Sequence, residues 1–227
     1  MRIGILTFLA VFVMSGVSYA SDVYITQSGA SFTANINQDG QTNRYGVSGT
    51  VATHTGDNHT LDIDQIGSSN TIASTVVGAT QELTLRQAGN SNTSTVTVGS
   101  NSAAASNSII QTLTGNSNTT TINVGTAAAS GTADIDLVAT GNSNTVTINE
   151  NSTASLSGSD KKVTNITLIG ASNTVTSTHA GAADQDTTLH HTGASSTFLF
   201  TQDGAYDGTI SITTVGSGHN VTVIMDD

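Results

Sequence analysis

Few residues in this chain are of the types that catalyse reactions or bind metal ions, and their spacing can be compared with what such chemistry needs. His190 and His191 are adjacent, and Asp184 and Asp186 lie just before them. A metal site needs side chains that converge on one point, whereas neighbouring residues of a β-strand point to opposite faces. We therefore expect one histidine to be buried and the other to lie on the surface, with no metal bound.

Glu150 falls at a position that we expect to face inward. A catalytic carboxylate would need a partner beside it, and no acidic residue lines up with it in the sequence. We expect a local distortion there, or a side chain turned outward into the loop that follows. The sequence also lacks a phosphate-binding loop, Gly-Gly-x-Gly-x-Asp calcium repeats and an aromatic platform. We expect no catalytic residue, no cofactor and no enzymatic activity.

A repeated pattern must position these side chains, and it is clearest at residues 83–98. Apolar and polar residues alternate from Leu83 to Gln87, a Gly-Asn-Ser-Asn sequence follows at 89–92, and alternation resumes to Val98. Alternation with a period of two indicates a strand, and Gly, Asn and Ser between two such runs indicate a turn. One unit is therefore a strand, an arc and a second strand.

The unit recurs along the chain with constant internal offsets. A glycine lies two residues after the position of Gln87, an asparagine lies five residues after it, and a second stacking position follows eleven residues after it. The connections between units vary in length, mainly at 100–106, 126–131 and 151–162, as solvated loops can. The residues expected to form the arcs and stacking columns are Gln27, Gly29, Gln38, Gln65, Gly67, Asn70, Gln87, Gly89, Asn92, Gly115, Asn118, Gly141, Asn144, Gly170, Asn173, Gly193 and Gln202.

The N-terminal part fits the pattern less well. We align Gln27 with Gln65 and Gln87 as the first position of a unit, which puts Phe32 in the place of the asparagine and makes Gln38 the second position. His54 lies eleven residues before Gln65, so the 16 residues from Gln38 to His54 include about five too many for one half-turn.

The alternating positions predict the fold. One set of positions is mostly Ile, Leu and Val, and the intervening positions are rich in Thr, so the first set faces a core and the second faces solvent. One unit cannot bury its apolar face alone, and stacked units build a continuous core. We predict an all-β fold, a two-sheet β-solenoid of about eight or nine strand-arc-strand coils. The coils are expected to be irregular over residues 21–64 and regular over residues 65–227.

Residues 1–20 have the features of a secretory signal peptide. Arg2 is followed by an apolar run from Ile3 to Val13, and small residues precede the end of the segment at Ala20. Its removal takes away one positive charge, so the net charge of −11 becomes −12, from four Lys and Arg against 16 Asp and Glu. We expect a secreted chain with no membrane span after removal of the signal. The negative charge argues against nucleic acid as a partner.

The Gln-x-Gly-x-x-Asn arc, with a second Gln eleven residues after the first, resembles the curlin repeat of the curli amyloid subunits. Gln27, Gly29 and Gln38 match it, Ser21 takes the place of its leading serine, and the arcs at Gln65 and Gln87 match its first half. In the middle coils both glutamine positions are aliphatic instead. The resemblance implies a secreted subunit that self-associates into cross-β fibres of a biofilm matrix or adhesive surface. It also implies an outer-membrane export pore and a nucleating subunit as partners.

Two binding functions are the alternatives to a fibre subunit. Thr-x-Thr-x-Thr sequences on one face resemble the ladders of β-solenoid ice-binding proteins. A solenoid of this kind could also be the stalk of an adhesin or bind carbohydrate, although no aromatic cluster marks a sugar site. Independently of the resemblance, the strand at 221–225 is apolar and is followed only by two aspartates. Low-charge, Pro-free β segments of this kind favour stacking of one subunit on the next.

Overall fold

The computed structural model describes residues 8–15, 21–47, 49, 51–99, 106–125, 132–152, 162–181, 184–203 and 208–226. Every regular element in these ranges is a β-strand, and the strands form two parallel sheets. The first sheet has the order β1 (Phe8–Ser15), β4 (Phe32–Asp39), β7 (His59–Ile66), β9 (Gln81–Ala88), β11 (Ser106–Thr114), β13 (Thr132–Thr140), β15 (Lys162–Ile169), β17 (Gln185–Ala194), β19 (Gly208–Ser217).

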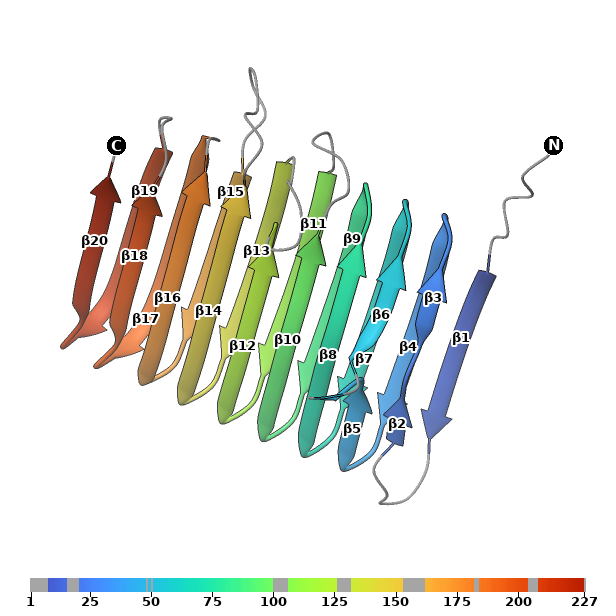
Figure 1. Cartoon of the computed structure of the whole chain (residues 1–227). Coiled ribbons are helices and arrows are strands. Elements are labelled where there is room, and N and C mark those ends of the chain that lie inside the picture. Colours follow the sequence, from blue (N-terminus) through green and yellow to red (C-terminus); the bar gives the residue numbers. More distant parts are fainter. Residues whose placement is uncertain are drawn as a thin grey trace.

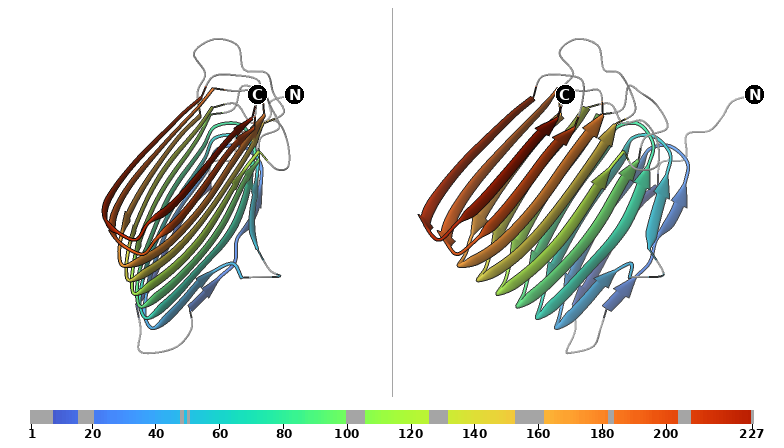
Figure 2. Two further views of the ribbon diagram at one scale, coloured as in Figure 1. Left: turned by 90° about the vertical axis from the view of Figure 1, so that its left-hand side faces the viewer. Right: turned by 60° about the vertical axis from the view of Figure 1, so that its left-hand side comes forward.

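The second sheet lies against the first and follows the same order along the molecule (Figures 1 and 2). Its strands are β2 (Ser21–Val23), β3 (Thr26–Ser28), β5 (Thr42–Tyr45), β6 (Ala52–Thr55), β8 (Ser69–Val77), β10 (Ser91–Gly99), β12 (Ser117–Val124), β14 (Ser143–Ser152), β16 (Ser172–Gly181), β18 (Thr197–Asp203), β20 (Asn220–Asp226). Among the described residues, no helix is both long enough and apolar enough to cross a membrane.

The chain passes from one sheet to the other at each tight arc, which makes a β-solenoid. The pairs from β7 with β8 to β19 with β20 form about seven regular turns, and β4, β5 and β6 form an irregular one before them. The all-β solenoid predicted from the repeat is confirmed, with close to the eight or nine coils expected. The irregular part lies N-terminal to the regular turns.

Identical positions of successive units lie directly opposite one another. Leu85, for example, pairs with Ile63 on one side and Gln111 on the other. Because the pairing is parallel and in register, each inward position becomes a column that runs along the rod. These columns form one continuous apolar core, which includes Leu61, Ile63, Leu83, Leu85, Val96, Ile109, Ile122, Ile135, Leu137, Ile148, Ile166, Val175, Leu189, Phe198 and Phe200.

Glycine is needed in the arcs because successive arcs approach backbone to backbone. A Cβ on Gly141 would collide with the carbonyl oxygen of Gly115 in the preceding arc, and a Cβ on Gly115 would collide with that of Gly89. The obstacle is main chain that the sheets on both sides hold in place, so it cannot move aside as a flexible side chain can. The glycine offset in the sequence therefore reflects packing between arcs.

The predicted register of the N-terminal coil is wrong by half a turn. Gln38 pairs with Gln65, in the first stacking position rather than the second. Gln27 pairs with His54, in the second position rather than the first. Correspondingly, a Cβ on Gly56 would collide with the carbonyl of Gly29, so Gly29 stacks at the opposite edge from Gly67. The true first arc is Gln38-x-Gly40-x-x-Asn43, which matches the motif in full.

The five extra residues expected between Gln38 and His54 are found in the second sheet. Tyr45 pairs with Ile72 and Ala52 pairs with Ser74, so two residues that are seven apart in the sequence pair with residues that are two apart. The insertion divides one strand into β5 and β6, and the offset to the paired residue of β8 falls from 27 residues in β5 to 22 residues in β6. The variable connections at 100–105, 126–131 and 153–161 lie outside the described residues, as do residues 1–7 and 16–20 of the expected signal peptide.

Candidate functional site

A column of buried asparagine side chains runs along the arcs, and we call Asn43, Asn70, Asn92, Asn118, Asn144 and Asn173 the asparagine ladder. Each Nδ2 donates to Oδ1 of the next asparagine, at 3.4, 3.0, 2.8, 2.7 and 2.7 Å from Asn43 to Asn173. The same amides also donate to backbone carbonyls; Asn118 Nδ2, for example, reaches Thr140 O at 3.1 Å. The ladder thus ties adjacent arcs together, and Asn43 Oδ1 at its first position is the ladder oxygen that has no partner among the described residues.

The ladder ends at a buried histidine. Asn173 Nδ2 lies 2.8 Å from His191 Nε2, and Ser196 takes the asparagine position in the next arc, where its Oγ accepts from the backbone N–H of Asn173 at 3.1 Å. His191 is 2% exposed whereas His190 is exposed, as the alternation of strand side chains predicts. Among the described residues, no group of three or more His, Cys, Asp or Glu side chains could hold a metal ion.

A shorter glutamine ladder lies beside it, made of Gln38, Gln65 and Gln87. Gln65 Nε2 donates to Gln38 Oε1 at 2.7 Å, and Gln87 Nε2 donates to Gln65 Oε1 at 2.9 Å. The same column continues through Leu113, Ala139 and Leu168 to His191. Gln202 is also buried but stacks on His179 in the other column. This column therefore changes from amide stacking at its N-terminal end to aliphatic stacking in the middle of the rod, where the asparagine ladder continues.

Glu150 lies inside the rod, and the expected outward turn or distortion is wrong. It is 1% exposed and pairs in register with Val124 and His179. Its Oε2 lies 2.6 Å from His179 Nδ1, and His179 Nε2 lies 2.8 Å from Ser177 Oγ and 3.0 Å from Thr187 Oγ1. The partner that compensates this carboxylate is a histidine one turn later, 29 residues along the chain, and no local sequence signal indicates it.

This carboxylate–imidazole–hydroxyl arrangement has the geometry of a proton relay, but it is closed to substrates. Ser177, His179 and Thr187 are each at most 1% exposed. The side chain of Lys162 is also fully buried nearby; burial lowers its pKa, and the charge of Glu150 opposes that shift. Within the described part of the chain, Lys162 Nζ and Glu150 Oε1 have no hydrogen-bond partner, and the whole group lies inside the core.

Aromatic and histidine side chains fill the irregular N-terminal turn. Tyr45 OH lies 2.6 Å from His54 Nε2, and the rings of Phe32 and His54 stack with centroids 5.0 Å apart. Burial raises the pKa of Tyr45, so its hydroxyl stays a donor. Burial, with a smaller contribution from His59, lowers the pKa of His54 to about 4, so the ring is neutral and accepts that hydrogen bond.

The outer face of the second sheet carries threonines in register. Thr71, Thr93, Thr119, Thr145, Thr174 and Thr197 form one unbroken column. Beside it, Thr95, Thr121, Thr147 and Thr176 form a second column that ends at Leu199. We call these two columns the threonine face. Hydroxyl and methyl groups recur on it at the spacing of the strands, about 4.8 Å.

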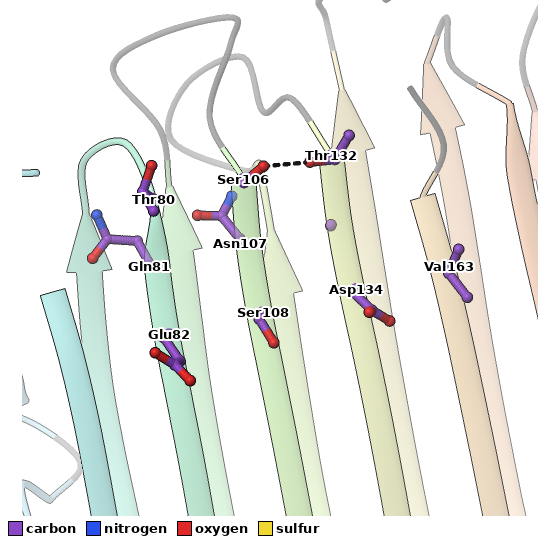
Figure 3. Close-up of a pocket in the computed structure, with 10 residues that line it drawn as sticks. Thr80, Gln81, Glu82, Ser106, Asn107, Ser108, Thr132, Asp134 and Val163 are labelled. Atoms are coloured by element: carbon purple, nitrogen blue, oxygen red, sulfur yellow. Dashed lines mark hydrogen bonds between the residues drawn. The ribbon is translucent and has the colours of Figure 1, made fainter. Parts of the chain in front are cut away.

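A cavity of about 460 Å³ lies at the start of β9, β11 and β13 (Figure 3). Its lining includes Gln81 and the buried Asn107, together with Glu82 and Asp134 from the outer face. Ser106 Oγ and Thr132 Oγ1 bridge two of these strands at 2.9 Å. Burial, with a smaller contribution from Asp136, raises the pKa of Asp134. Its lining residues are mostly polar, but most of the surface that they expose to the cavity is apolar, and the cavity lies next to the ends of the variable connections.

Comparison with protein-family models, with curated proteins and with solved structures finds no match to this chain.

We expect the asparagine ladder to be a main source of stability. Replacing Asn118 by Ala removes the hydrogen bonds of its Nδ2 and leaves Asn144 Oδ1 without its donor, which should cost roughly 2–4 kcal/mol of unfolding free energy. The matched control is Asn123→Ala, which removes the half-buried Asn149–Asn123 bond of 2.8 Å and should cost under about 1 kcal/mol. Urea unfolding followed by circular dichroism measures both. Equal losses of unfolding free energy in the two variants would show that the ladder contributes no more than the half-buried amide pair does.

Acid should destabilise the fold through His54. Its pKa is about 4 in the folded chain and about 6.5 when unfolded, so below pH 6.5 the unfolded chain takes up a proton that the folded chain does not. Stability is therefore complete above that pH and falls toward pH 4, by about 2 kcal/mol at pH 5. Urea unfolding at pH 7 and pH 5 should show a smaller loss in His54→Gln than in the unsubstituted chain. An identical loss in both would rule His54 out as the cause.

Proposed function

We propose that this protein is a secreted structural subunit that stacks end to end into extracellular cross-β fibres, of the kind that the resemblance to the curlin repeat implies. The solenoid fold suits a repeat protein that builds structure or binds a surface. Export follows from the signal peptide expected at residues 1–20. An outer-membrane export pore and a nucleating subunit are the partners that this function would need.

The open end of the rod at β19 and β20 is the observation that carries the proposal. Val221, Val223, Ile224 and Met225 are 43–56% exposed, and Ile210 and Ile212 are only partly buried against the core. No described strand pairs with the outer edges of β19 and β20. Residues 208–226 contain no Lys, Arg or Pro, which are the residues that usually protect an open edge. A second rod could bury this surface and pair both edges.

The buried ladders favour a rigid, repeating subunit over an adaptable one. In a fibre built from such rods, the columns of equivalent residues must continue in register from one subunit into the next. In-register columns supply that register, because every rung places equivalent groups at equivalent points.

Residues 21–227, diluted from denaturant, should form fibres that bind thioflavin and give a reflection near about 4.8 Å. In Val223→Lys the monomer should stay folded, because the side chain is exposed, while fibre elongation should fall at least tenfold. Thr174→Lys is the control, since it places the same charge on the exposed outer face of β16, away from the ends. A protein that stays monomeric and dye-negative at high concentration would contradict the proposal.

The threonine face favours a second candidate, which is binding to ice. Its two columns are flat, regular and free of charge over four or more consecutive strands. If ice is the ligand, the purified protein should show thermal hysteresis, and Thr121→Lys should abolish it by interrupting one column. Thr112→Lys, on the outer face of the first sheet, should leave it unchanged. Absence of hysteresis in the unsubstituted protein would exclude this function.

A further inference from the structure

Strand β1 occupies the outer edge of β4, at the N-terminal end of the first sheet. Eight residues pair in parallel, from Phe8 opposite Phe32 to Ser15 opposite Asp39. In Figure 1, β1 lies as the outermost strand beside β4. Since residues 1–20 are expected to be removed as a signal peptide, the occupant of this edge changes when the chain matures.

The number of rungs in the two sheets depends on β1. A rung is one level of the stack of strands. In the second sheet β2 pairs with β5 and β3 pairs with β6, and both β5 and β6 pair with β8. Strands β2 and β3 therefore share one rung, and β5 and β6 share the next. The eleven strands of that sheet therefore form nine rungs, and the first sheet has nine strands including β1. Without β1 the first sheet has eight. The N-terminal end then has a notch one strand wide beside β4.

At the other end of the rod the two sheets end at the same level, because β19 and β20 belong to the same turn. A second copy stacked on it through its β2 and β3 would leave the notch as a gap between β19 and β4. The gap closes only if residues 21–28 of the second copy move aside. These residues form two strands of three residues each, and Tyr24 between them is 47% exposed. Except for Val23, their described side chains are exposed or half-buried.

With residues 21–28 moved aside, the two ends are complementary in register. The column of Ile36 ends at Ile212, and the column of Tyr45 ends at Val221. Stacking β19 on β4 of the next copy would therefore place Ile212 opposite Ile36. Stacking β20 on β5 and β6 would place Val221 opposite Tyr45 and Val223 opposite Ala52. These three pairs are apolar, whereas Gln38 would lie opposite Thr214 and His54 opposite Met225.

We propose that the outer edge of β4 is a strand-accepting site, which β1 occupies in the full chain and which β19 of a second copy occupies once β1 is gone and residues 21–28 have moved aside. Occupancy of this edge by a second copy rests on the fibre function proposed above. Residues 8–15 then act as a cap that keeps the precursor from stacking. Residues 21–28 slow stacking after the cap is removed.

The first experiment tests the cap on the full-length monomer. Phe12→Pro with Val13→Pro removes two consecutive backbone N–H groups, so β1 cannot pair whichever of them faces β4. Hydrogen exchange of the β4 amides that face β1, about half of residues 32–39, should become at least tenfold faster, and exchange in β15 should not change. Phe12→Leu with Val13→Ile is the control and should leave both unchanged. Unchanged β4 exchange in the proline variant would overturn the assignment of β1 to this edge.

The second experiment tests the second copy as occupant, with full-length chains only. The time to half-maximal thioflavin fluorescence should be longest in the unsubstituted chain and at least tenfold shorter with the two prolines in β1. It should be shorter still when Thr26→Pro and Gln27→Pro are added to release β3. Slower assembly on adding the second pair would overturn the proposal, because β2 and β3 would then form the joint. If no chain assembles although β4 exchange responds, the fibre function fails and β1 alone is the occupant.

Discussion

In-register parallel stacking of identical arcs is the constraint on which the rest of this structure depends. Neighbouring rungs are about 4.8 Å apart, so each arc must fit directly on the one before it. Glycine meets this requirement at the closest approach, where a Cβ on Gly141 would meet the carbonyl of Gly115. The asparagine ladder meets it with hydrogen bonds, since each side-chain amide has a partner only when its neighbour sits at the same height. Loops outside the arcs are not constrained, and their lengths differ.

The fold could be predicted from the sequence because the constraint is periodic. A fixed offset between Gln, Gly and Asn repeats often enough to outweigh the degeneracy of any single copy, and strand alternation then divides the core from the surface. The predicted register was wrong in the N-terminal coil, where the matching sequence is shortest. Gln27-Ser28-Gly29 matches the start of the arc, but Gln38-x-Gly40-x-x-Asn43 matches all of it, and giving weight to the asparagine would have fixed the register. The partner of Glu150 could not be found in this way, because His179 compensates it across a turn and not along the chain.

A rod of this kind places its polar chemistry inside and leaves its ends open. The pair of Glu150 with His179 and the group of Tyr45 with His54 are enclosed by apolar columns, so they act within particular rungs, and the protonation of His54 affects the stability of the fold. The ends are different, because a solenoid without a covering element exposes both an apolar cross-section and unpaired backbone groups. At the C-terminal end these are β19 and β20, and at the N-terminal end β1 covers one sheet only. Function in this architecture is therefore most readily sought at the ends and on the regular outer faces.

The central claim is that intact solenoids stack without refolding, and the length of fibre per chain tests it most directly. Mass per unit length, measured by dark-field electron microscopy of unstained fibres, gives that quantity. Eight or nine rungs at about 4.8 Å each predict one chain per roughly 40 Å of fibre. One chain per about 4.8 Å would instead mean that each molecule unfolds and adds a single layer of an ordinary cross-β stack. That result would contradict the account.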